Sequence, residues 1–165
     1  MVSLLSPQTF FRLVLEEGYL RQNPIESIIL KPPKASPIEP YKQEHIDAFV
    51  RILEHNWNTA LTQRQKMLAA RDRAVLFLLL DSLVRLEECT HLLASDIDLE
   101  RQRIIVRKTK NGKTRLAGFG PLAKKALWRY LGLRNNLVEL DALWITEEGH
   151  PLTRHGIQDI MKRLK

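Results

Sequence analysis

Residues 103–119 read RIIVRKTKNGKTRLAGF, and this stretch decides the fold because the spacing of its apolar residues changes from helical to alternating. At its centre, Asn111-Gly112 is typical of a two-residue type I′ turn, in which both central residues need a positive φ. We therefore predict an antiparallel pair of strands, Arg103 to Arg107 and Thr114 to Phe119. Because most of the chain has helical spacing, the predicted fold class is α+β, mainly helical, with a small antiparallel sheet.

Three helices are predicted between residue 45 and the hairpin. His45 to Trp57 carries apolar residues at helical spacing, and Leu61 to Leu83 is apolar on all sides in its second half, which indicates burial in a core. Its segment 74–80, AVLFLLL, could also form a buried strand, but the length of the segment and the residues around it favour a helix. The third helix is Arg85 to Leu93.

After the hairpin, two further helices are predicted on either side of a possible strand at Ala142 to Thr146. The first is Pro121 to Leu133, because proline suits the first turn of a helix. The second is Arg154 to Leu164, for which Thr153 is a good N-cap residue.

A proline-rich stretch separates the first residues from the rest of the chain. Five prolines between Pro24 and Pro40 lock φ and remove hydrogen-bond donors, so this stretch is predicted to be an extended linker. The helix predicted at Pro7 to Tyr19 cannot bury its apolar face alone. We therefore interpret residues 1–22 as the tail of another domain, 23–41 as the linker and 42–165 as a separate domain.

The composition indicates a soluble and basic protein. Lys plus Arg number 26 and Asp plus Glu number 19, which gives a net charge of +7. Such a charge makes a polyanion a plausible partner without selecting one. No apolar run reaches the roughly 18 residues of a membrane span, and the first residues lack the features of a signal peptide. The single cysteine, Cys89, fits a reducing compartment, so we expect a cytoplasmic protein without a membrane partner.

The predicted hairpin is strongly basic. No acidic residue occurs between residues 101 and 115, so the basic charges stand unopposed in the sequence. Such a ribbon can enter a DNA groove and neutralise phosphates; the alternative is a solvated sheet edge whose charges prevent aggregation. We favour contact with a nucleic acid. The basic residues are Arg101, Lys110 beside the turn, and the five that we assign to DNA contact, Arg103, Arg107, Lys108, Lys113 and Arg115.

Arg85 stands between two predicted helices, three residues before Glu88, so that the two side chains can pair on one helix face. Two interpretations remain open. The pair can be a structural salt bridge, or Glu88 can hold the guanidinium so that it meets a phosphate with two parallel hydrogen bonds.

The order of the motifs resembles that of the tyrosine recombinase, or phage integrase, family. Residues 82–98, SLVRLEECTHLLASDID, are similar to the first catalytic box of that family, T-G-[LM]-R-[IL]-x-E-x-x-x-L followed by D-I-D. Residues 109–115, TKNGKTR, resemble its hairpin pattern T-K-x-G-K-x-R. Residues 147–164 resemble its G-x-P-[LI]-[ST] turn with the following helix, and residues 16–34 resemble the end of its N-terminal core-binding domain with the interdomain linker.

The resemblance implies roles for particular residues. Arg85 matches the first catalytic arginine, which binds the scissile phosphate, and Lys110 matches the hairpin lysine, a general acid toward the leaving 5′ oxygen. Glu88 matches a supporting acid. In this family a tyrosine attacks the phosphodiester, and no metal or other cofactor is needed because arginines stabilise the developing charge. The implied partners are double-stranded DNA and other recombinase protomers.

Departures from the family pattern bear on activity. Leu83 stands where a glycine is usual, and the second box, H-x-x-R followed by the tyrosine nucleophile, is not found in the 165 residues. His150 and Arg154 are one residue too far apart for that box, and Tyr130 lies on an apolar helix face, which predicts a place in the core. We therefore expect the DNA-binding portion of a site-specific recombinase, a truncated catalytic-domain fragment that does not cleave DNA by itself. The alternative is a non-enzymatic DNA-binding accessory protein derived from a decayed integrase.

Overall fold

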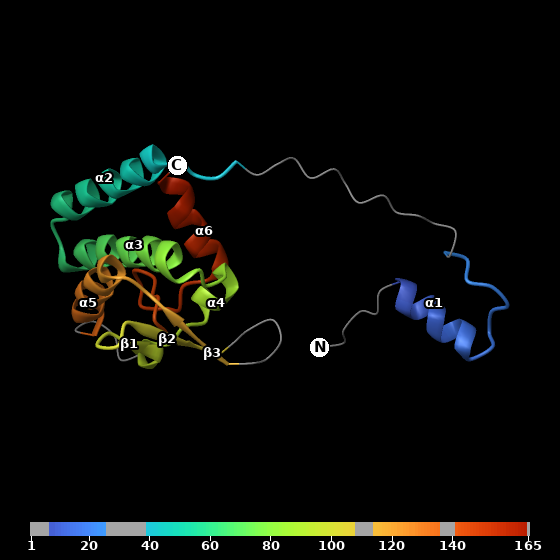
Figure 1. Cartoon of the computed structure of the whole chain (residues 1–165). Coiled ribbons are helices and arrows are strands. Elements are labelled where there is room, and N and C mark those ends of the chain that lie inside the picture. Colours follow the sequence, from blue (N-terminus) through green and yellow to red (C-terminus); the bar gives the residue numbers. More distant parts are fainter. Residues whose placement is uncertain (1–6, 26–38, 108–113, 136–140, 165) are drawn as a thin grey trace. The chain divides into compact units, whose positions relative to one another are not determined.

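Helix α3 (Gln63–Ser82) is the central element of the larger of two units into which the chain divides (Figure 1). The computed structural model describes residues 7–25, 39–107, 114–135 and 141–164. The smaller unit spans Met1–Pro40 and the larger unit spans Tyr41–Lys165. The assignment of residues 1–22 to a domain tail and of 23–41 to a linker stays a prediction.

Two reciprocal hydrogen bonds between Thr62 and Gln65 cap the N-terminus of α3. The Thr62 hydroxyl accepts from the backbone N–H of Gln65 at 3.1 Å, and the Gln65 side chain accepts from the N–H of Thr62 at 3.1 Å. These bonds satisfy N–H groups that a helix N-terminus leaves without a partner inside the helix. Every residue from Ala74 to Leu78 is buried, as expected for a helix that is packed on several sides. The helix prediction for residues 74–80 is therefore confirmed and the strand alternative is wrong.

Two helices, α2 (Gln43–Thr59) and α5 (Pro121–Asn135), pack against α3. Tyr130 of α5 stacks on Trp144 with ring centroids 5.5 Å apart, and both side chains are fully buried. The prediction that Tyr130 lies in the core is confirmed. A smaller cluster joins α2 and α3 to the end of α6 (Arg154–Arg163), through Phe49, Leu53, Leu76 and Leu164.

The predicted strands belong to a three-stranded antiparallel sheet. Strand β2 (Arg103–Val106) is central and pairs with β3 (Arg115–Gly118). A strand that the sequence did not predict, β1 (Ile97–Asp98), pairs with the other edge of β2. Ile104 and Val106 are buried and alternate with half-buried neighbours, so one face of the sheet packs on the core. The predicted Asn111-Gly112 turn lies outside the described residues.

The segment after α3 is less regular than predicted. Helix α4 (Leu86–Thr90) has five residues, and a 3-10 turn at Ala94–Asp96 follows it, so the predicted helix from Arg85 to Leu93 is too long. Instead of the possible strand at residues 142–146, Ala142 and Ile145 form isolated antiparallel bridges with Leu93 and Pro151 respectively. The cap of α6 is as predicted, because the Thr153 hydroxyl accepts from the N–H of Gly156 at 3.2 Å.

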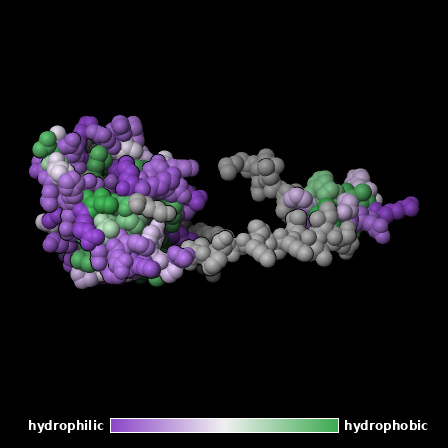
Figure 2. Space-filling model, turned by 90° about the horizontal axis from the view of Figure 1, so that it is seen from above, coloured by the Kyte–Doolittle hydropathy of each residue, from purple (hydrophilic) through white to green (hydrophobic). Residues whose placement is uncertain are grey.

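The smaller unit contains α1 (Pro7–Glu16), none of whose residues is buried. Phe10, Leu13 and Leu15 leave large apolar side chains exposed on this helix, and Figure 2 shows apolar surface in green on this unit. The larger unit is mainly hydrophilic on the face drawn in Figure 2, with smaller apolar areas between purple side chains. Across the described part of the chain, no helix combines the length and the apolar character that crossing a membrane requires.

The link between α3 and α4 contains a strained residue. Leu83 has φ 51° and ψ 27°, and its side chain is 83% exposed. A left-handed conformation costs a residue with a Cβ about 1–2 kcal/mol, whereas glycine adopts it freely.

We expect Leu83→Gly to raise the free energy of unfolding by about 0.5–1 kcal/mol, because relief of this strain exceeds the added entropy of the unfolded chain. Urea denaturation measures the change. Leu83→Ala is the control, since it keeps the Cβ and should bring no gain. A loss of stability in Leu83→Gly would show that the leucine side chain makes a favourable contact.

Candidate functional site

Arg85 is positioned by the turn between α3 and α4. The left-handed Leu83 ends α3, and Arg85 becomes the N-cap residue of α4 with an extended backbone, φ −67° and ψ 151°. Its side chain is 68% exposed. The guanidinium therefore lies at the surface, where a ligand can reach it, and not between two apolar helices.

Glu88 is the buried centre of the site, with a side chain only 2% exposed. Its Oε2 accepts from the backbone N–H of Arg85 at 3.0 Å, and its Oε1 accepts from Nη1 of Arg85 at 3.1 Å. Nη2 of Arg115, on β3, donates to Oε2 at 2.6 Å. One carboxylate thus caps α4 and holds two arginines that are 30 residues apart in sequence.

The predicted pairing of Arg85 with Glu88 is present, but its geometry is that of a helix cap. Arg85 precedes the first residue of α4, so the two residues do not share a helix face. Arg85 forms a structural salt bridge with the buried carboxylate of Glu88, and its guanidinium nevertheless stays exposed. Both interpretations of the sequence are therefore compatible with the geometry.

Glu88 carries a negative charge at neutral pH despite its burial. Burial alone raises the pKa of a carboxyl group, but the backbone N–H of Arg85 and the Arg115 guanidinium outweigh it and lower the pKa of Glu88 below its usual value. The cluster of Glu88, Arg85 and Arg115 therefore keeps one net positive charge. Such a cluster can attract an anion such as a phosphate.

The arginines of the hairpin that the structure describes are paired with acids, which corrects the expectation that the basic charges stand unopposed. Arg103 donates to Asp98 at 3.1 Å, and Arg107 pairs with Asp96. Each acid precedes the hairpin in sequence, and the register of β1 with β2 places Asp98 directly opposite Arg103. The basic run therefore overstates the free positive charge of this ribbon. The arginines of this run that the structure describes form these ion pairs: Arg101 and Arg103 with Asp98, Arg107 with Asp96, and Arg115 with Glu88.

Three of the predicted site residues, Lys108, Lys110 and Lys113, lie outside the described residues. The structure brings together Arg85, Glu88 and Arg115, whereas Arg103 and Arg107 are held by other acids of the sheet region.

Asp96 holds Arg107, one of the residues predicted to contact DNA, and this pairing was not predicted from the sequence. Its carboxylate is almost completely buried, accepts from the N–H of Leu93 at 3.1 Å and pairs with Arg107. The D-I-D motif was the available signal, but it does not indicate which basic residue each aspartate meets.

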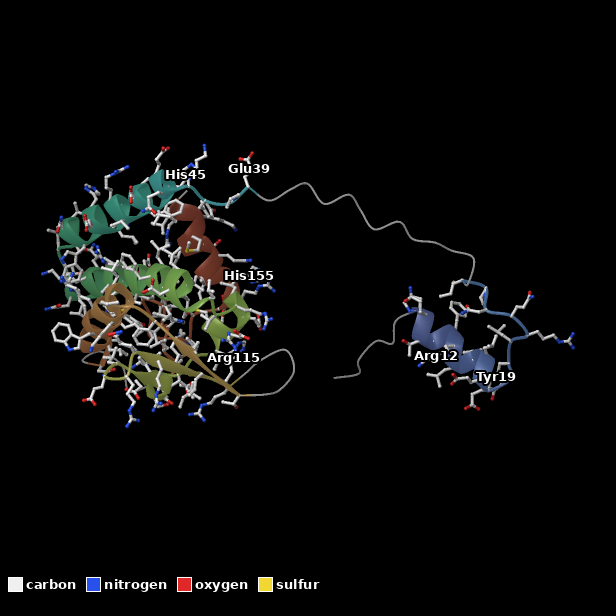
Figure 3. The ribbon with its side chains drawn as sticks, in the orientation of Figure 1. Arg12, Tyr19, Glu39, His45, Arg115 and His155 are labelled. Carbon is white, nitrogen blue, oxygen red and sulfur yellow. The ribbon has the colours of Figure 1, made fainter. Side chains whose placement is uncertain are left out.

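The start of α6 adds exposed polar residues to the surroundings of this site. Helix α6 contacts α4, and Arg154 and His155 in its first turn are exposed. Arg115 and His155 lie on the same side of the larger unit in Figure 3. His150 lies in the preceding turn and Arg154 opens the helix, so they occupy separate structural positions.

A metal site and a tyrosine nucleophile are two further features on which the chemistry of the chain depends. Within residues 7–25, 39–107, 114–135 and 141–164, no three His, Cys, Asp or Glu side chains gather where they could hold a metal ion. The hydroxyl of Tyr130 is buried and bonded to the backbone, and burial raises the pKa of Tyr130 to about 12. Tyr130 is therefore not placed as a nucleophile.

The family model described as "Phage integrase family" matches residues 49–165. This chain belongs to the phage integrase family. The resemblance to tyrosine recombinases that the motifs indicated is confirmed, and so is the α+β, mainly helical fold class.

Relatives include tyrosine recombinases of the XerC type. The protein of Listeria welshimeri serovar 6b is 29% identical over 96% of this chain and 52% of its own length. That of Alcanivorax borkumensis is 33% identical over 94% of this chain and 49% of its own length. The chain thus spans about half the length of the curated relatives that it matches.

Solved structures of family members have the same fold. The XerA recombinase is 25% identical with a TM-score of 0.61, over 96% of this chain and 50% of that protein. The Tn1549 transposon integrase, solved in complex with transposon right end DNA, has a TM-score of 0.64 at 20% identity. That match covers 96% of this chain and 54% of the integrase, and at this identity it supports the fold alone.

Proposed function

We propose that this chain binds double-stranded DNA as part of a site-specific tyrosine recombinase, and that Arg85 contacts a backbone phosphate. The observation that carries the proposal is the exposed guanidinium of Arg85 held on the buried carboxylate of Glu88. A charged side chain fixed in this way loses less conformational freedom when it binds an anion than a freely rotating one.

The geometry suits a phosphate. Glu88 takes up Nη1 of Arg85, and the exposed part of the guanidinium keeps further N–H donors for a phosphate oxygen. Arg115 adds a second positive charge to the cluster, although its Nη2 is engaged by Glu88. We therefore assign phosphate contact to Arg85 and a supporting role to Glu88.

The family pattern supports the role of Lys110 and the domain limits, and the basic charge of the ribbon supports the further phosphate contacts. Lys110 serves as the hairpin general acid, and Lys108, Lys113, Arg103 and Arg107 contribute phosphate contacts along the ribbon. Residues 1–22 correspond to the end of a core-binding domain, 23–41 to the interdomain linker and 42–165 to part of the catalytic domain. Other recombinase protomers are the expected protein partners, and no cofactor takes part.

Positioning a phosphate is separate from cleaving it. A covalent step needs an activated nucleophile within reach of the phosphate, and Tyr130, the tyrosine in α5, is buried. We propose that the 165 residues supply the binding half of the site. Cleavage would then need a segment with an H-x-x-R box and a tyrosine, and the accessory-protein alternative predicts that adding such a segment restores nothing.

We expect weak and mainly sequence-independent DNA binding with a strong dependence on salt. Each phosphate contact adds about 0.9 to the negative slope of log affinity against log salt concentration. Fluorescence anisotropy with a labelled random duplex at several salt concentrations measures that slope. Arg85→Ala should weaken binding and reduce the slope by about one unit.

The control for this measurement is Arg51→Ala, which removes an exposed arginine on α2. It should leave both affinity and slope close to those of the unchanged chain. Equal effects of the two substitutions would mean that only net charge matters, and the Arg85 assignment would be wrong. Absence of binding at low salt would refute the DNA-binding proposal itself.

A further inference from the structure

A pocket of about 300 Å³ lies between the C-terminal part of α2, the middle of α3 and the first half of α5. Its volume is at the lower end of the range for small-molecule and side-chain pockets. The proposed phosphate contact does not involve any of its residues. The lining residues that matter for its chemistry are Glu54, Trp57, Arg73, Leu122, Lys125 and Arg129.

Three cations and one carboxylate line this pocket, so it has an excess of positive charge. Oε1 of Glu54 lies 3.4 Å from Nη1 of Arg73. Glu54 forms no such ion pair with Lys125 or Arg129. Throughout the described residues, no acidic side chain lies within ion-pair distance of Lys125 or Arg129. The pocket is therefore complementary to an anionic group.

Aromatic rings hold two of these cations in place. The Arg129 guanidinium lies over the Trp57 ring at 4.7 Å from its centroid, and that of Arg73 lies over Phe77 at 5.2 Å. A cation–π contact orients a guanidinium without neutralising its charge. The positive charge is thus positioned before any ligand arrives.

Exposed apolar side chains continue from the pocket along α5. Leu122 is 60% exposed and Trp128 is 69% exposed. With Lys125 they stand at intervals of three residues, so neighbouring members lie next to each other on the helix surface. Arginine and tryptophan are enriched at the energetic centres of protein interfaces. A cationic pocket beside an exposed tryptophan therefore fits a protein ligand.

We propose that this pocket and the adjoining surface of α5 dock an acidic, apolar segment of a partner protein. A carboxylate of that segment enters between Arg73, Lys125 and Arg129, and an apolar side chain lies on Leu122 and Trp128. DNA fits this surface less well, because protein–DNA interfaces are strongly polar and positive, whereas this surface includes Glu54 and large apolar side chains. Arg115 and His155 lie on the right side of the larger unit in Figure 3, whereas α5 and the C-terminal part of α2, which line the pocket, lie on its left side in Figure 1.

The test uses two fluorescein-labelled peptides and the full chain. One peptide carries three Glu and two Leu at helical spacing, and the other has Gln in place of each Glu. Hydrogen bonds to a charged acceptor are stronger than those to a neutral one, so we expect binding of the Glu peptide to be at least about tenfold tighter in anisotropy titrations. Arg129→Glu and, separately, Trp128→Ala should each weaken binding of the Glu peptide by a similar factor.

The matched control is Lys42→Glu, which reverses an exposed lysine at the other end of α2 and should change binding less than twofold. Thermal melts identify a variant that fails to fold, and Arg129→Gln is then the milder substitute. Equal affinity for the two peptides, or insensitivity to both α5 variants, would overturn the proposal. The proposal would also be wrong if Arg129→Glu lost as much duplex binding as Arg85→Ala, because DNA would then be the occupant. Self-association of the chain that Trp128→Ala abolishes would likewise overturn it, because the occupant would then be a second copy.

Discussion

Replacing Glu88 with alanine should lower the free energy of unfolding by about 2–3 kcal/mol and also weaken DNA binding. The buried carboxylate accepts from the Arg85 backbone, the Arg85 guanidinium and the Arg115 guanidinium. Loss of a fully buried ion-pair partner costs about 3–5 kcal/mol. The cost is smaller here because both arginines are partly exposed and can be hydrated once the carboxylate is gone.

The effect on DNA binding has a separate cause. Without Glu88 the Arg85 side chain is no longer held, so binding a phosphate must also restrict its rotation. Urea denaturation measures stability, and duplex anisotropy measures binding on variants shown to be folded. Arg115→Met is the companion variant, because it removes one charged partner of Glu88 and keeps an apolar stem. If Glu88→Ala loses stability but binds duplex as well as the unchanged chain, Glu88 has a structural role only.

Glu88 should also make the stability of the folded chain depend on pH. The pKa of Glu88 is lower in the folded chain than in the unfolded chain, because its bonds to Arg85 and Arg115 favour the charged form over the effect of burial. Its contribution is therefore complete above the unfolded pKa of about 4.3 and is lost as the pH falls through the lower folded pKa. Glu88→Gln should reduce the acid-side slope of stability against pH. An unchanged slope would mean that other carboxyl groups account for it.

The second large effect is expected for Tyr130→Phe. The Tyr130 hydroxyl donates to the backbone carbonyl of Leu143 at 2.8 Å and accepts from the N–H of Ile145 at 3.2 Å. Phenylalanine fills the same volume but leaves both buried backbone groups without this partner, which costs about 1–3 kcal/mol. Urea denaturation should show this loss in the free energy of unfolding. Trp144 should keep its stacked position against the ring at position 130.

Alkaline pH provides a further readout for Tyr130. Burial raises the pKa of Tyr130 to about 12 in the folded chain. Its contribution to stability is complete below the unfolded pKa of about 10 and is lost as the pH rises toward the folded value. Tyr130→Phe should remove that part of the alkaline slope.

A suicide DNA substrate, nicked beside the cleavage site, tests the chemical role of Tyr130. The unchanged chain should form no covalent adduct on a denaturing gel. Fusion to a recombinase segment with an H-x-x-R box and a tyrosine should permit one, and Arg85→Ala should abolish it. An adduct of the unfused chain that disappears in Tyr130→Phe would contradict the structural role of this tyrosine.

The elements whose patterns are local could be predicted from the sequence. The apolar spacing identified α2 and α3, and the alternation around residue 104 identified β2. Pro121 and Thr153 marked the starts of α5 and α6. The motifs around Arg85 and the hairpin also indicated the family, because they are short patterns in a fixed order that can be recognised without the tertiary structure. These features depend on residues that are near each other in the chain, so the sequence alone carries them.

Apart from the pairing of Arg85 with Glu88, only the tertiary structure decided which charges meet. Glu88 reaches Arg115 across 27 positions, and Asp98 meets Arg103 because of the register between β1 and β2. The length of α4 and the irregular path of residues 142–146 were likewise decided by packing. Composition shows that a hairpin is basic, but register and burial determine which of its cations an acid already holds. For this reason the sequence indicated the site residues Arg85 and Glu88, whereas the fold alone placed Arg115 beside them.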